Sequence, residues 1–143
     1  MTSQFDDLIA ATDLLLEREL EAHRRNMSAS ARVAGELAQI DAMRRAAQAD
    51  QGAVGARQLL GADTLWQGWL VGKRAEALRQ SAIARAREGE SLARARTAFS
   101  RAQAAEALAR DEKEARKRRR LKAEAEAIDA LGMLREAKAR GLG

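Results

Sequence analysis

The chain has 143 residues, with 34 alanines and no proline, cysteine or tyrosine. The absence of cysteine excludes disulfides and thiolate metal sites, and the lack of a roughly 20-residue apolar stretch argues against a membrane span. Strong helix formers dominate, whereas bulky side chains that could fill a globular core are scarce. Composition therefore predicts an all-α fold, an elongated two-helix antiparallel coiled-coil hairpin that forms a single domain over residues 1–143.

The first predicted helix covers about residues 3–55. Apolar side chains recur there at steps of three and four residues, which is typical of a coiled coil. The residues expected to face the second helix are Phe5, Leu8, Leu15 or Leu16, Leu20, His23, Met27, Ala34, Leu37, Ile40 and Ala47. His23 is the sole histidine, so a structural role is expected for it, because a metal or catalytic site needs convergent partners.

A turn is predicted at about residues 52–63, where Gly52, Gly55 and Gly61 cluster. Each glycine inside a helix costs about 1 kcal/mol relative to alanine. The second predicted helix covers about residues 64–139, and its length leaves roughly 20 C-terminal residues without a partner. Its expected inward-facing residues are Leu65, Trp69, Leu78, Ile83, Leu92, Ala95, Phe99, Ala102, Leu108, Ala115, Leu121, Ala125, Ile128 and Leu131.

Charge is divided between the two halves of the chain. Residues 1–63 hold 7 Arg and no Lys against 10 acidic residues, a net charge of −3. Residues 64–143 hold 19 basic against 11 acidic residues, a net charge of +8. This division favours antiparallel pairing, and it leaves positive charge on the second helix for a partner.

Two groups of residues are candidates for partner binding. Trp66 and Trp69 share one helix face, where they either close the tip of the hairpin or anchor a partner. The second group is a dense basic cluster: Arg116, Lys117, Arg118, Arg119, Arg120 and Lys122. Acids flank this cluster and no aromatic residue stands nearby, which favours a solvated or protein-binding surface over nucleic acid.

No motif for catalysis is recognisable in the chain. Carboxylates alternate with Arg and Lys, as on solvated helix faces, and the glycines match no phosphate-binding loop. We therefore expect no catalytic residues, no metal site, no cofactor and no enzymatic activity.

The layout resembles the FliJ family of flagellar export proteins and the YscO-type proteins of type III secretion. The similar features are the length, the two unequal helices, the glycine-containing turn and the charged stretch from Arg116 to Asp129. The resemblance implies a cytoplasmic component of a protein export apparatus, peripheral to the inner membrane through its partners. It further implies a stalk-like role in a hexameric export ATPase, a link to the membrane export gate, and a role as an export chaperone that escorts substrates or other export chaperones.

Two other functions stay open from the sequence. One is a nucleic-acid-associated basic coiled coil, and the other is a structural scaffold or homodimeric spacer. The sequence leaves undecided the register of the hairpin, the oligomeric state, and the choice between a flagellar and an injectisome system.

Overall fold

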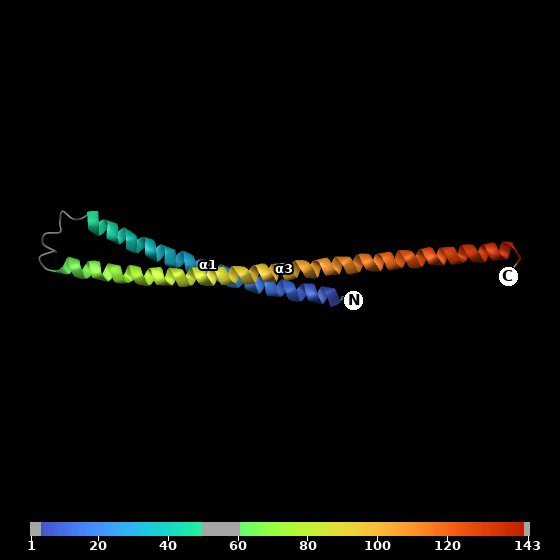
Figure 1. Ribbon diagram of the computed structural model, residues 1–143, viewed down its shortest axis with the longest axis horizontal. Helices are drawn as coiled ribbons and strands as arrows, with labels where there is room; N and C mark the ends of the chain where they lie inside the picture. Colours follow the sequence, from blue (N-terminus) through green and yellow to red (C-terminus); the bar gives the residue numbers. More distant parts are fainter. Residues whose placement is uncertain (1–3, 50–60, 142–143) are drawn as a thin grey trace. The chain divides into compact units, whose positions relative to one another are not determined.

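The computed structural model describes residues 4–49 and 61–141, which form the helices α1 (Gln4–Ala49) and α3 (Ala62–Ala139) (Figure 1). The two helices pack against each other, and the described residues contain no strand. The predicted two-helix hairpin is therefore confirmed. Most of the predicted turn at 52–63 lies outside the described residues, as does the expected end of the first helix.

The described helix ends follow local chemistry. Asp6 and Asp7 occupy the first turn of α1, where the helix dipole favours negative charge. Beyond α3, Gly141 has a φ of 73°, and its amide donates to the carbonyl oxygen of Lys138 at 3.1 Å. Because side chains with a β-carbon rarely adopt this left-handed conformation, a glycine at this position ends the helix.

The chain divides into two compact units. The middle unit is Leu14–Phe99, and the terminal unit combines Met1–Asp13 with Ser100–Gly143. Helices α1 and α3 each contribute to both units.

In the middle unit, polar contacts establish that α1 and α3 are antiparallel. His23 lies 2.8 Å from Ser91, and Asp41 lies 2.9 Å from Arg74. Residue numbers thus rise along α1 as they fall along α3. In each pair the two numbers add to 114 or 115, which defines the register that the sequence left open.

Burial along α3 follows a seven-residue repeat. The buried residues Leu70, Ala77, Ala84, Ser91, Ala98 and Ala105 are each seven apart. A second series lies four residues after the first, and it includes the buried Ala95 and Ala102. Such a 4–3 alternation is the pattern of a coiled coil, whose inward positions are named a and d. Leu70 begins the d series, and Ala95 and Ala102 belong to the a series.

The same repeat governs α1. Its d series consists of residues 5, 12, 19, 26, 33, 40 and 47, all buried or half-buried, and the a series of residues 9, 16, 23, 30, 37 and 44 is half-buried. Among the predicted inward residues this confirms Phe5, Leu16, His23, Leu37, Ile40 and Ala47. The prediction is wrong for Leu8, Leu20, Met27 and Ala34, which are exposed.

The predicted inward face of α3 is wrong for most of its residues. Ala95 and Ala102 are buried and Ala115 is half-buried, but Leu78, Leu92 and Phe99 are exposed. Each of these three follows a buried Ala77, Ser91 or Ala98 by one residue, so the larger side chain stands beside the interface. Small residues occupy its centre because they allow the two helix backbones to approach closely.

The other large residues predicted to face inward on α3 are exposed as well. They are Leu65, Trp69, Ile83, Leu108, Leu121, Ile128 and Leu131, and Ala125 is also exposed. Size was therefore a poor guide to the buried face of this helix.

In the terminal unit, α3 changes from partly buried to fully exposed towards its C-terminal end. Ala102 and Ala105 are buried, whereas every residue from 116 to 136 is exposed. This confirms the predicted unpaired segment of α3, which we call the free segment (residues 116–136). Neither described helix is long and apolar enough to cross a membrane.

Candidate partner-binding surfaces

The helix interface of the middle unit contains one buried polar side chain among the described residues, Ser91. Ser91 is 3% exposed, and its hydroxyl donates to the carbonyl oxygen of Glu88 at 3.0 Å. Since that hydroxyl has one proton, the 2.8 Å contact with His23 requires the Nδ1–H of the imidazole to donate to Ser91 Oγ. His23 thus joins the two helices through a side-chain hydrogen bond.

The hydrogen bonds of this His–Ser pair indicate a structural role and not a nucleophilic one. A nucleophilic serine gives its proton to the histidine and exposes its oxygen to a substrate. Here the serine proton is directed to a backbone carbonyl, and the hydroxyl is buried between two helices. The geometry supports the structural role expected for His23.

Two further polar contacts connect the helices of the middle unit. Asn26 Nδ2 donates to the carbonyl oxygen of Arg87 at 3.2 Å, and Arg74 Nε donates to Asp41 Oδ1 at 2.9 Å. Residues 4–49 and 61–141 include no group of three His, Asp or Glu residues placed to hold a metal ion.

The two tryptophans lie on α3 in the middle unit and contact each other. Their ring centroids are 5.0 Å apart with an interplanar angle of 20°, so the indoles stack. Trp66 is 43% exposed and Trp69 is 48% exposed. The ammonium of Lys73 lies 5.6 Å from the centroid of Trp69, within the range of a cation–π contact. Both indoles therefore present large apolar surface to solvent, as the partner-anchor hypothesis requires.

Glu76 lies about two turns after Trp69 on α3. Gln80 donates a hydrogen bond to its carboxylate at 3.1 Å, and Arg79 forms an ion pair with it. The hydrogen bond from Gln80 is the main reason that the pKa of Glu76 lies below its ordinary value, and the Arg79 charge adds to the effect.

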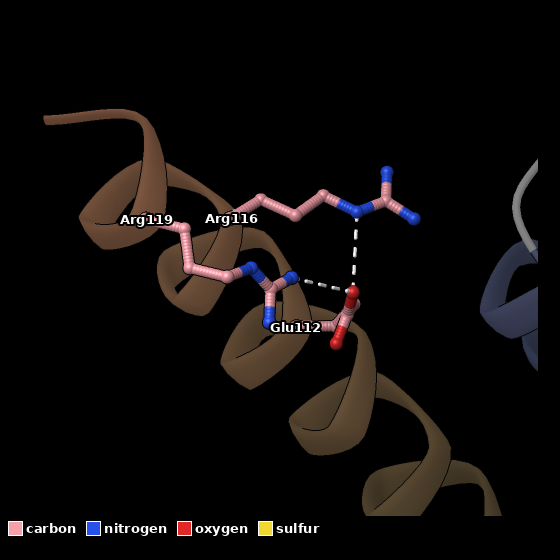
Figure 2. A network of polar contacts seen from close by, with 3 residues as sticks. All are labelled: Glu112, Arg116 and Arg119. Atoms are coloured by element: carbon pink, nitrogen blue, oxygen red, sulfur yellow. Dashed lines mark hydrogen bonds and ion pairs between the residues drawn. The ribbon is translucent and has the colours of Figure 1, made fainter. Parts of the chain in front are cut away.

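The basic cluster lies on α3 in the terminal unit, and part of it is paired with acids. Figure 2 shows Arg116 and Arg119 converging on Glu112, at 3.2 and 3.3 Å from the same carboxylate oxygen. Arg118 lies 3.9 Å from Glu114. Such exposed pairs contribute about 0.2–1 kcal/mol each.

The rest of the basic cluster is unpaired. Lys117, Arg120 and Lys122 are exposed and form no ion pair with any residue that the structure describes. Together the six residues encircle the helix, as five consecutive positions must at 3.6 residues per turn. Half of the cluster therefore retains its full charge for a partner.

A hollow of about 580 Å³ lies beside this cluster in the terminal unit. The hollow is lined by residues of both helices, including the apolar Phe5 and Ile9 of α1 and the basic Lys113 and Arg116 of α3. This hollow could not be predicted from the sequence, because it forms where the start of α1 meets α3.

The two predicted binding groups belong to different units, so the structure does not unite them in one site. Exposed arginines on the same flank as the tryptophans were not predicted. The seven-residue spacing of Arg87 and Arg94 is visible in the sequence. It identifies a shared flank with the tryptophans only when the position of the helix interface is known.

No protein-family model, curated protein or solved structure matches the chain. The class that the fold defines is a two-helix, coiled-coil-like hairpin.

Proposed function

We propose that the protein is a non-enzymatic component of a flagellar or type III protein export apparatus. It acts as a stalk-like partner of the hexameric export ATPase in the cytoplasm, contacts the export gate at the inner membrane, and serves as an export chaperone that also binds other export chaperones. The proposal rests on the resemblance of the chain to FliJ- and YscO-type proteins. The observation that carries it is the free segment of α3, which is helical and exposed at every residue from 116 to 136.

The free segment supports this role in three ways. It is a single helix, so it is narrow enough to enter a ring. It begins with the basic cluster, in which Lys117, Arg120 and Lys122 have no acidic partner among the described residues. It continues with exposed apolar side chains, including Ile128 and Leu131, which a protein partner can cover.

The pairing of the basic cluster favours a protein partner over nucleic acid. Glu112 and Glu114 neutralise part of the charge of Arg116, Arg118 and Arg119. Carboxylates among the cations repel phosphates, and the free segment has no aromatic side chain on which a base could stack.

The test is ATP hydrolysis by a purified hexameric export ATPase with and without the full chain. We expect the chain to bind the hexamer and to raise the rate of ATP hydrolysis. The variant K117Q/R120Q/K122Q removes the three unpaired cations, and we expect it to lose most of the stimulation.

The matched control is R45Q/R85Q/R96Q, which removes three exposed arginines without described ion pairs from the middle unit. It changes the net charge equally and should retain full stimulation. A wild-type chain that neither binds the hexamer nor alters its rate would contradict the proposal. So would an equal loss in both variants, because net charge alone would then explain the effect.

A further inference from the structure

The tryptophans share one flank of the middle unit with unpaired arginines. With Leu70 at position d of the repeat, Trp66, Arg87 and Arg94 fall at position g, and Trp69 and Ile83 fall at position c. Positions g and c lie next to each other on one side of d, whereas e and b lie on the opposite side.

Helix α1 adds an arginine to the same flank. In an antiparallel pair the g positions of both helices border one flank. The hydrogen bond from Asn26 to the carbonyl oxygen of Arg87 places that part of α1 beside Arg87. Arg25 occupies position c of α1, and it lines a hollow of about 410 Å³ together with Ala29 at position g.

We define the Trp–Arg face as Trp66, Trp69, Ile83, Arg87 and Arg94 of α3 with Arg25 of α1. All six side chains are exposed. None of the three arginines forms an ion pair with a described residue. Together with tyrosine, tryptophan and arginine are the residues enriched among those that dominate binding energy at protein interfaces.

We infer that the Trp–Arg face binds an acidic amphipathic α-helix of a partner protein. The stacked indoles and Ile83 offer an apolar area at one end, and the arginines offer positive charge at the other. Arg87 and Arg94 are seven residues apart, about 10.5 Å along the helix, which equals the spacing of two carboxylates seven residues apart on a partner helix. From Trp66 to Arg94 the face extends about 42 Å, the length of a helix of about 28 residues.

The chemistry of the face favours a helix over nucleic acid. Glu76 and Glu90 occupy position c among the basic residues, where they would repel a phosphate backbone. Trp69 is already engaged by the ring of Trp66 and by the ammonium of Lys73, which leaves less of its face for a base. A partner helix can place a basic residue opposite each glutamate, which a nucleic acid cannot do.

The test uses a 28-residue helical peptide that carries leucines in one half and glutamates seven residues apart in the other. A peptide of the same composition in scrambled order and a single-stranded oligonucleotide are the comparison probes. Because the chain has only two tryptophans, its intrinsic fluorescence reports binding at the Trp–Arg face directly.

We expect the patterned peptide to shift the tryptophan emission and to bind at least about tenfold more tightly than the scrambled peptide. The variant R25Q/R87Q/R94Q should weaken binding by about tenfold or more, whereas R45Q/R85Q/R96Q should bind like the wild type. Both variants replace one arginine of α1 and two of α3, and circular dichroism will verify that both remain helical.

Four results would overturn the inference. Three of them are no binding of the patterned peptide, equal binding of both peptides, and equal weakening by both triple variants. The fourth is binding of the oligonucleotide in place of the peptide. The assay contains no export ATPase, so its outcome is independent of the proposed function.

Discussion

Two stretches of α3 carry the same series of alanines but differ in burial. Ala95 and Ala102 are buried, whereas Ala123 and Ala130, at the same position of the seven-residue repeat, are exposed. Alanines of the a series continue past the residues that α1 covers, although the d series there holds the charged Arg119 and Glu126, so an alanine at an a position does not by itself create an interface. Burial on α3 depends on whether a partner helix lies against it.

The largest effect that would test this comparison is expected from Leu70→Ala. Leu70 is 1% exposed and is the one bulky side chain among the buried d residues of α3 in the described part of the chain. Its truncation should lower the free energy of unfolding by about 2–3 kcal/mol, because it removes buried area and leaves a cavity. Urea unfolding followed by circular dichroism measures the change. Leu131→Ala in the free segment should change stability by less than about 0.5 kcal/mol, and an equal loss would contradict the assigned burial.

The same substitution at two alanines of α3 compares the covered part of the helix with the free segment directly. Ala102→Leu adds three carbons where the helices approach closely and should destabilise the chain by about 1–3 kcal/mol. Ala123→Leu makes the same change three repeats later on the exposed free segment, so it should leave the urea midpoint nearly unchanged. If both variants unfold at the wild-type midpoint, the small residues of α3 are not in close contact with α1.

A smaller effect is expected from the buried polar contact of the interface. Ser91→Ala removes the acceptor of the His23 Nδ1–H bond and should lower stability by about 1 kcal/mol, partly offset by the helix propensity of alanine. Because His23 is the sole histidine, its ring resonances in an NMR spectrum report the loss unambiguously. Ser100→Ala, at an exposed position, should leave both stability and the ring resonances unchanged. Unshifted His23 resonances in the Ser91 variant would show that the bond is absent.

The smallest effect concerns Glu76 and pH. The pKa of its carboxyl is lower in the folded chain than its ordinary value of 4.5, so the ionised form stabilises the fold above that pH. The contribution is lost as the pH falls through the folded-state pKa. Glu76→Gln should therefore reduce the decrease in melting temperature between neutral pH and pH values well below 4.5. If the melting temperature of the wild type and that of the variant decrease by the same amount over this pH range, the assigned hydrogen bond from Gln80 is contradicted.

Several features of the fold could be predicted from local sequence. Composition and three- to four-residue spacing predict two helices because helix propensity and amphipathic pattern act within a few residues. The unequal predicted helices, about residues 3–55 and 64–139, also predict the exposed end of α3, since the shorter helix cannot cover the longer one along its whole length.

The candidate binding surfaces were predictable only in part. Trp66 and Trp69 stand out by residue type, and the basic cluster stands out by density. The arginines of the Trp–Arg face do not, because Arg87 and Arg94 resemble every other arginine of α3 until the interface is located.

Local sequence was sufficient to predict the helices, the division of charge and the positions of the two tryptophans along the chain. Which face of α3 is buried became evident only from its packing against α1. Ranking residues by size placed Leu78 and Phe99 inside, whereas packing against α1 placed Ala77 and Ala98 there. The physical reason is that two helices gain contact along their whole length when small residues let the backbones approach. That gain depends on both helices at once and is not encoded in either one alone.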